Sequence, residues 1–432
     1  MNWQRIAIFA LTFLGLILWV TMPLVILVAG AGFCVWLATT QNGRQTVALT
    51  RIGLSTLPER LGATMVIIVG IAGVVGVLIA LLAMAEGFQA TLRQAGEDDV
   101  AIVMRKGANA ELSSSIDRST VNVVRQAAGV LHDADDLPIA SAEVVVVSNI
   151  PKRTTGSDAN VELRGVGPEV WKLRPNARIT AGRAFKPGLR ELVVGQGALG
   201  QFSGLDIGSN LLLNNQLWTV VGSFTTGDAH ESELWGDVES VAAAYRRTSF
   251  QAVSLRLTGP EAFAGLKERL ESDPRIKVDV MTTRDYYSKQ SQQMTKIIRA
   301  IGIGVAIIMA IGAMFGALNT MYAAVAARAR EIAMMRALGF QNLPVVLSAL
   351  LEAMLLALLG GALGALIAYV IFNNYSVSTL GGNFTQVVFQ FRVTGGLMFG
   401  GLQWALAIGF LGGLFPALRA ATVPVTVALR EL

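Results

Sequence analysis

The residue types that perform metal and acid–base chemistry gather most densely in one segment of this 432-residue chain. His230, one of only two histidines, stands in the sequence GDAHESELWGD, with Asp228, Glu231, Glu233 and Asp237 around it. Histidine and carboxylate side chains can bind a metal ion, but these residues do not repeat the ligand spacing of a metal site. The segment is therefore predicted to be a solvated loop, and no metal site is expected.

Motifs for phosphate chemistry and hydrolysis are missing from the sequence. It contains no G-x-x-x-x-G-K-[ST] phosphate loop, no nucleophile elbow and no H-E-x-x-H motif. We therefore expect a chain that is not an enzyme, does not hydrolyse ATP itself and holds no cofactor. The single cysteine, Cys34, excludes an intrachain disulfide.

Docking onto a protein partner is the chemistry predicted for residues 328–340, here called the docking segment. Ile332, Met335 and Leu338 recur every three residues, as on one or two turns of helix, and Gly339 is a typical residue to end a helix. Exposed apolar and arginine side chains suit insertion into a partner's groove, with Arg328 expected at the rim. An interfacial helix whose arginines reach lipid headgroups is the alternative. The candidate docking residues are Arg328, Arg330, Glu331, Met335, Arg336, Leu338, Gly339 and Phe340.

Long apolar runs place the docking segment at a membrane. A bilayer's hydrocarbon core is crossed by about 20 residues at 1.5 Å rise per residue. Composition agrees, because 53% of the residues are hydrophobic and 15% are charged, against about 25% charged in soluble chains. The formal charge of +5 clusters beside apolar runs, which indicates positive-inside topology rather than nucleic-acid binding. Spans are predicted at residues 61–87, 297–325, 345–372 and 395–418, and cytoplasmic segments at residues 326–344 and 419–432.

The N-terminal region is predicted to form a hydrophobic hairpin over residues 1–43 that turns near Pro23, because its apolar run is too long for one comfortable span. Two short spans would place Trp3, Trp19 and Trp36 at the interfaces that tryptophan favours, whereas a single long span is the alternative. Residues 44–60 are predicted to form a cytoplasmic amphipathic helix. Its apolar face is expected to hold Val47, Leu54, Leu57 and Leu61.

Residues 88–296 contain no run that could span a membrane, and they are predicted to form an extracytoplasmic α/β domain. Expected strands lie at 100–104, 142–148, 161–165, 191–194, 211–214, 218–224 and 252–257. A turn is expected at Asn214–Asn215 and a helix over 260–273. The flanks of the domain, 86–95 and 283–299, are expected to continue the neighbouring spans as a helical stalk. Residues 373–394 are expected to be a short polar loop on the same side of the membrane.

Small residues within the spans indicate close helix packing. The candidate packing residues are Gly70, Gly73, Gly312, Gly316, Gly360 and Gly364. Glu352 is the one acidic residue in its span. An intramembrane carboxylate is a functional candidate, and pairing with an arginine on the cytoplasmic side is the simpler expectation.

Two motifs carry a family resemblance. The string ARAREIAMMRALG, followed by LLEAMLLALLGGALGALIAY, resembles the FtsX-type permease domain, and the ending LFPALRAATVPVTVALREL is similar to the close of that domain. The α/β domain resembles the MacB periplasmic core domain. The fold class expected from this resemblance is an α-helical integral membrane protein with a large α/β extracytoplasmic domain and an FtsX-type transmembrane domain.

The resemblance also implies a function and partners. The chain would be the permease subunit of a mechanotransmission complex in the bacterial inner membrane, exporting a small molecule, peptide or lipoprotein. The docking segment would be a coupling helix on a separate ABC ATPase subunit, which binds ATP and Mg²⁺. Further expected partners are a second permease subunit, membrane lipids, a periplasmic adaptor and an outer-membrane duct, but no nucleic acid. An FtsX-like regulator of a cell-wall hydrolase and a non-transporting receptor or anchor are the alternatives.

Overall fold

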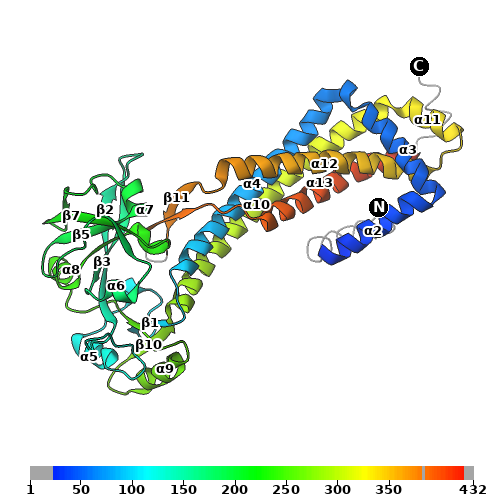
Figure 1. Cartoon of the computed structure of the whole chain (residues 1–432). Helices are drawn as coiled ribbons and strands as arrows, with labels where there is room; N and C mark the ends of the chain where they lie inside the picture. The colour runs from blue at the N-terminus through cyan, green and yellow to red at the C-terminus, as the bar shows by residue number, and fades with distance from the viewer. Residues whose placement is uncertain (1–22, 382–384, 423–432) are drawn as a thin grey trace. The chain divides into compact units, whose positions relative to one another are not determined.

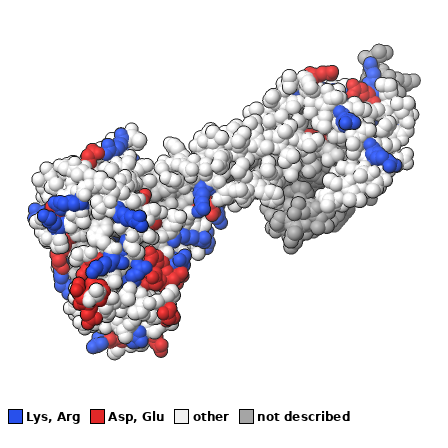
Figure 2. All heavy atoms as spheres, in the orientation of Figure 1, with Lys and Arg blue, Asp and Glu red and all other residues white. Residues whose placement is uncertain are grey.

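The computed structural model describes residues 23–381 and 385–422, which form two compact units. The helical unit takes the described parts of Met1–Ala83, Ile298–Asn373 and Arg392–Leu432. The α/β unit is made of Met84–Ile297 and Asn374–Phe391. On the face shown in Figure 2, the charged side chains crowd the α/β unit, whereas most of the described surface of the helical unit is uncharged.

Long apolar helices dominate the helical unit (Figure 1). Its elements are α2 (Pro23–Thr39), α3 (Gln41–Ser55), η1 (Leu57–Arg60), α4 (Leu61–Gln94), α10 (Thr283–Ala327), α11 (Ala329–Ala337), α12 (Asn342–Phe372) and α13 (Gly395–Thr422). Among the described helices, α4, α10, α12 and α13 are long and apolar enough to cross a membrane. Both α4 and α10 also contribute residues to the α/β unit, as the predicted helical stalk requires.

The helix α2 meets α3 at a tight corner. The Oγ1 atom of Thr40 accepts a hydrogen bond from the backbone N–H of Gly43 at 2.9 Å, which caps the start of α3. A Cβ atom on Gly43 would lie 2.4 Å from the carbonyl oxygen of Trp36, so the corner requires glycine. Residues 1–22 lie outside the described residues, so the hairpin expected over residues 1–43 stays a prediction.

Small residues form the buried face of α3, which packs against α12. The buried residues recur at intervals of three and four and are Gly43, Thr46, Leu49, Thr50 and Gly53. The apolar face expected from Val47 is wrong, because Val47 is exposed. At a membrane, large apolar side chains can face lipid while small residues let two helices approach closely, which reverses the pattern of a soluble helix.

A ten-stranded mixed sheet organises the α/β unit. The strands are β1 (Val100–Arg105), β2 (Ala140–Pro151), β3 (Asp158–Val166), β4 (Arg178–Gly182), β5 (Glu191–Gly195), β6 (Asn210–Leu213), β7 (Gln216–Thr225), β8 (Glu233–Asp237), β9 (Ala252–Arg256) and β10 (Val278–Thr282). Their order is β10-β1-β9-β2-β3-β8-β5-β7-β4, with β6 paired to β7. The β3–β8 and β5–β7 pairs are parallel.

Short helices cover the sheet and close its core (Figure 1). They are α5 (Arg118–Arg125), α6 (Val170–Leu173), α7 (Gln196–Gln201), α8 (Val238–Ala244) and α9 (Ala262–Ser272), with the turns η2 (Glu111–Ser113) and η3 (Ala229–Ser232). Buried Leu266 and Leu270 anchor α9, the helix predicted over 260–273. Asn214 and Asn215 have positive φ angles of 46° and 58°, which confirms the predicted hairpin turn between β6 and β7.

The chain between α12 and α13 is a β-hairpin and belongs to the α/β unit. Its strands are β11 (Ser376–Leu380) and β12 (Gln386–Gln390). Phe389 is buried against Phe88, with 5.5 Å between the ring centroids, and the backbone N–H of Val388 donates to Ser232 Oγ at 2.8 Å. The prediction of a plain polar loop was wrong, because alternate side chains of β12 are apolar and pack inward.

Candidate coupling segment and its cavity

The docking segment forms the short helix α11, separated from α10 by a single residue. Arg328 leaves helical geometry, with φ −101° and ψ 9°, and its backbone N–H is shared between the carbonyls of Ala324 and Val325 at 3.3 and 3.2 Å. The helix therefore bends at Arg328 without a long loop. This bend lets α11 point away from the axis of α10 while the two remain closely joined.

Gly339 ends α11 in a Schellman motif. Its φ is +102°, and its N–H donates to the carbonyl of Arg336 at 3.1 Å. The N–H of Phe340 reaches back to the carbonyl of Met335 at 3.2 Å. These two bonds satisfy carbonyls that the helix end would leave unpaired, and glycine adopts the left-handed conformation without strain. The prediction that Gly339 ends the helix is confirmed.

The inner face of α11 packs on the helical unit itself. Ile332, Met335 and Phe340 are partly buried against a cluster formed by Leu49, Val345 and Ala420. Met335 and Phe340 hold the two positions of the Schellman motif that usually carry apolar side chains, and both pack on this cluster. Met335 and Phe340 were expected to face a partner protein, and the structure instead places them in the contact that holds α11 to the bundle.

The outer face of α11 is exposed and carries both apolar and charged groups. Leu338 is 76% exposed and Met334 is 55% exposed, and Arg330 and Glu331 are exposed beside them. Arg330, Met334 and Leu338 lie four residues apart on one face of the helix. The sequence interpretation followed the three-residue spacing of Ile332, Met335 and Leu338, which mixes buried and exposed positions, and so left Met334 out of the candidate residues. The four-residue interval from Arg330 through Met334 to Leu338 was the signal that could have identified Met334.

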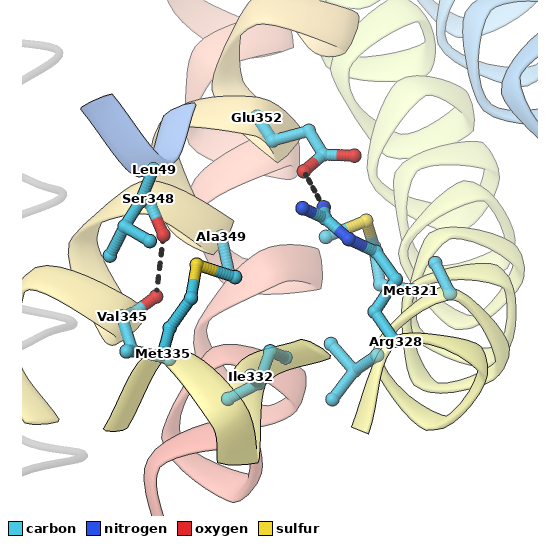
Figure 3. A pocket seen from close by; sticks show the side chains of 11 residues that line it. Leu49, Met321, Arg328, Ile332, Met335, Val345, Ser348, Ala349 and Glu352 are labelled. Atoms are coloured by element: carbon cyan, nitrogen blue, oxygen red, sulfur yellow. Dashed lines mark hydrogen bonds and ion pairs between the residues drawn. The ribbon is translucent and has the colours of Figure 1, made fainter. Parts of the chain in front are cut away.

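Arg328 turns its side chain into the bundle (Figure 3). Nη1 donates to Glu352 Oε2 on α12 at 3.3 Å, and Nε donates to Glu331 Oε2 at 3.3 Å. The Arg328 side chain is only 12% exposed, so it does not lie at the rim of a docking surface as expected. The predicted pairing of Glu352 with an arginine is confirmed, and the arginine is the residue at the bend.

A small cavity of about 40 Å³, partly open to the outside, lies behind α11 (Figure 3). Its polar lining is Arg328, Glu352 and Ser348, and the Ser348 hydroxyl already donates to the Val345 carbonyl at 2.9 Å. The apolar lining is Leu49, Met321, Ala324, Val325, Ile332, Met335, Val345 and Ala349. The cavity is small, so α11 packs against the bundle with little empty space behind the bend.

The predicted packing glycines divide into two groups. Added Cβ atoms would lie 2.7 Å from the Ile68 carbonyl oxygen at Gly360 and 2.4 Å from that of Ala72 at Gly364, so α12 and α4 touch backbone to backbone there. Gly70, Gly73, Gly312 and Gly316 have no neighbouring atom within 4 Å of such a Cβ. These four glycines pack against no other part of the described chain.

The segment predicted to be a solvated loop is buried in the α/β unit, forming η3 and β8. Inside the α/β unit, the guanidinium of Arg164 on β3 pairs with four buried carboxylates, one of which comes from this segment. The shortest distances are 2.6 Å to Glu111, 2.7 Å to Glu143, 2.5 Å to Glu162 and 2.8 Å to Glu233. Buried carboxylates need such a partner, and Arg164 lies on another strand, so the local sequence of the segment could not reveal it.

His230 completes this buried cluster. Its Nδ1 lies 2.9 Å from Asp228 Oδ1, and its Nε2 lies 3.0 Å from the hydroxyl of Tyr287. Burial would lower the pKa of His230, but the facing carboxylates of Asp228 and Glu233 outweigh it and raise the pKa. Burial would raise the pKa of Asp228, and His230 with the surrounding hydrogen bonds lowers it to about 2. Arg164 engages its carboxylates in salt bridges, which is a structural arrangement rather than a catalytic one.

Two family models match the chain. The MacB-like periplasmic core domain matches residues 64–273, and the FtsX-like permease C-terminal domain matches residues 303–425. The chain belongs to the FtsX-like and MacB-like family of ABC transporter permeases. With its four apolar helices, this permease is a multi-pass protein of the bacterial inner membrane.

Curated relatives of the permease are longer proteins. The macrolide export ATP-binding/permease protein MacB of Hahella chejuensis is 25% identical over 415 residues, covering 89% of this chain and 59% of the relative. The protein of that name from Campylobacter fetus subsp. fetus is 26% identical over 243 residues, covering 52% of this chain and 36% of the relative. The chain thus spans 36% to 59% of the length of these two relatives.

Solved structures resemble the permease over less than half of its length. The periplasmic region of MacB from Actinobacillus actinomycetemcomitans aligns with 12% identity and a TM-score of 0.35, covering 46% of this chain and 94% of that one. The extracellular domain of the transporter YknZ from Gram-positive bacteria aligns with 15% identity and a TM-score of 0.32, covering 42% and 100%.

Proposed function

We propose that this permease works in an ATP-driven complex, in which a separate ABC ATPase subunit binds ATP and Mg²⁺ and moves α11. The spans relay this movement to the α/β unit, which drives export of a small molecule, peptide or lipoprotein. A second permease subunit completes the complex, and a periplasmic adaptor with an outer-membrane duct carries the cargo onward. The relatives named as ATP-binding/permease proteins support the link to an ATPase.

The observation that carries the proposal is the two-sided character of α11. Its inner face is fixed by Met335 and Phe340, while its outer face exposes Leu338 and Met334. Exposed apolar side chains on a short helix that is already folded and packed supply a pre-organised contact, which lowers the entropic cost of binding a partner.

The four glycines without a packing partner among the described residues support the second permease subunit. Gly70 and Gly73 lie on α4, and Gly312 and Gly316 lie on α10, which has the least buried span of the four. Small residues on an uncovered apolar face suit contact with another helix in the membrane. A second copy, or a related permease subunit, would cover this face.

Binding to the ATPase tests the proposal most simply. The partner to use is a candidate ABC ATPase subunit from the same organism, purified and titrated onto the detergent-solubilised permease. Leu338→Asp should weaken binding by about 30-fold to 900-fold, which corresponds to a hot-spot loss of about 2 to 4 kcal/mol. Leu212→Asp is the matched control, because Leu212 is a similarly exposed leucine on β6 of the other unit. Equal binding by all three proteins would overturn the proposed docking face.

A further inference from the structure

Arg328 is the single non-helical residue between α10, the longest described helix, and α11. No continuous helix fixes the angle between α10 and α11, because Arg328 has left helical geometry. The angle is instead held by the packed inner face of α11 and by the contacts of the Arg328 side chain. That side chain is nearly buried and reaches Glu352, which is on α12 and not on either helix that Arg328 joins. The ion pair therefore ties the bend to a third helix.

Gly53 brings a fourth helix to the same point. A Cβ atom on Gly53 would lie 2.7 Å from Glu352 Oε2 and 3.1 Å from Arg328 Nη1. The backbone of α3 therefore lies directly on the ion pair, and a larger residue at position 53 would displace the paired side chains. Nearby, Arg60 at the end of η1 donates from Nη1 to the carbonyl of Ala324, in the last turn of α10, at 3.1 Å. The η1 turn that follows α3 is thus hydrogen-bonded to α10 just before the bend.

Burial makes the Arg328–Glu352 ion pair hard to break. Glu352 is buried and its pair with Arg328 is largely removed from water, so separating the two charges would leave each without its partner in a poorly solvated place. A movement of α11 that keeps the pair intact must carry α12 and α3 with it. A movement that leaves them behind must break the pair.

We infer that Arg328 is a positioning residue, which with Glu352 and Gly53 makes α11, α12 and the surface helix α3 move as one body. A movement that the ATPase imposes on α11 would then reach α12 and α3 through the Arg328–Glu352 ion pair, as well as along α10. The N-terminal surface helix then becomes a moving part of the permease. This inference rests on the proposed function, since it needs a partner that moves α11.

Measuring ATPase binding separately from ATPase stimulation tests whether the Arg328–Glu352 ion pair couples the helices. Permease variants are combined with the ABC ATPase, and binding affinity, stimulated ATP hydrolysis and hydrogen exchange of α3 are measured with and without ATP. Arg328→Gln should keep binding within about twofold, while the stimulation of hydrolysis falls at least about fivefold, the lower end of an ordinary coupling between sites. Addition of ATP should change exchange in α3 of the unmodified permease and leave it unchanged in Arg328→Gln.

Further variants keep the inference falsifiable if Arg328→Gln does not fold. Glu352→Gln removes the same ion pair with almost no change in shape and should uncouple in the same way. Arg328→Lys keeps the charge and should retain most of the stimulation. Arg51→Gln is the control, because Arg51 is exposed on the same helix as Gly53.

The two proposals fail in different ways. If Leu338→Asp leaves ATPase binding intact, the docking face is wrong, whatever Arg328 does. If binding is intact but Arg328→Gln and Glu352→Gln both stimulate hydrolysis like the unmodified permease, coupling through the ion pair is wrong and the docking face stands. An α3 helix whose exchange ignores ATP while α11 responds would also overturn coupling through the ion pair.

Discussion

Replacement of Arg164 by methionine should destabilise the α/β unit more than any exposed charge change in the same unit. The variant removes the cation that Glu111, Glu143, Glu162 and Glu233 share, and it leaves these carboxylates buried. Methionine fills a similar length of side chain without a charge, so the loss reports mainly on electrostatics. Because Arg174 still contacts Glu143 at 2.9 Å, part of the compensation survives.

The size of the loss can be bounded from the structure. Burial raises the pKa of Glu143, but Arg174 and Arg164 lower it from 4.5 to about 2, which corresponds to about 3 kcal/mol of preference for the ionised form. Breaking a buried pair generally costs about 3 to 5 kcal/mol. We expect a loss in that range, out of roughly 5 to 15 kcal/mol for a whole domain. For a domain of this size it corresponds to a fall of roughly 6 to 20 °C in Tm.

Hydrogen exchange of the full-length permease in detergent is the assay, followed in peptides from β3 and β8. Arg118→Met is the matched control: Arg118 also pairs with a glutamate, Glu239, at 2.6 Å, but both side chains are more than half exposed. Its loss should stay below about 1 kcal/mol. Equal protection of β3 and β8 in the two variants would refute the view that the Arg164 cluster stabilises the unit.

The remaining predictions concern pH and the glycines. Glu143 and Asp228 have pKa values of about 2 in the folded unit against 4.5 and 3.8 ordinarily, so their stabilisation holds above about pH 4.5 and is lost as the pH falls toward 2. His230 acts oppositely, because its pKa is raised above the ordinary 6.5. The stabilisation from protonated His230 is therefore complete below pH 6.5 and is lost as the pH rises through the raised pKa. His230→Gln should flatten the alkaline side of a stability–pH curve. Gly364→Leu should lower the thermal stability of the detergent-solubilised monomer, whereas Gly70→Leu should spare it and weaken subunit cross-linking, because only Gly364 touches backbone within the chain. A monomer equally disturbed by both leucines would contradict this division.

Features that depend on neighbouring residues in the sequence were predictable. The four spanning helices follow from apolar length, the hairpin turn at Asn214–Asn215 from its residue types, and the end of α11 from Gly339. The family motifs supplied the rest of the architecture. Each of these signals is contained in a few adjacent residues or in one uninterrupted run.

Features that depend on distant partners were not predictable. The GDAHESELWGD segment is polar, and only Arg164 on another strand makes its burial tolerable. The face of α11 that turns outward is determined by the cluster around Leu49 and Val345, which its own spacing does not contain. Arg328 likewise belongs inside the bundle because Glu352 lies within reach there.

Photo-crosslinking from position 338 tests the central claim most directly. A benzoylphenylalanine placed at Leu338 in the full-length permease should crosslink to the ABC ATPase in the assembled complex, and one placed at Leu212 should not. Leu338 is the most exposed large apolar residue of the docking segment, so a docked ATPase must lie against it. An intact complex in which neither position 338 nor position 334 crosslinks to the ATPase would contradict the account.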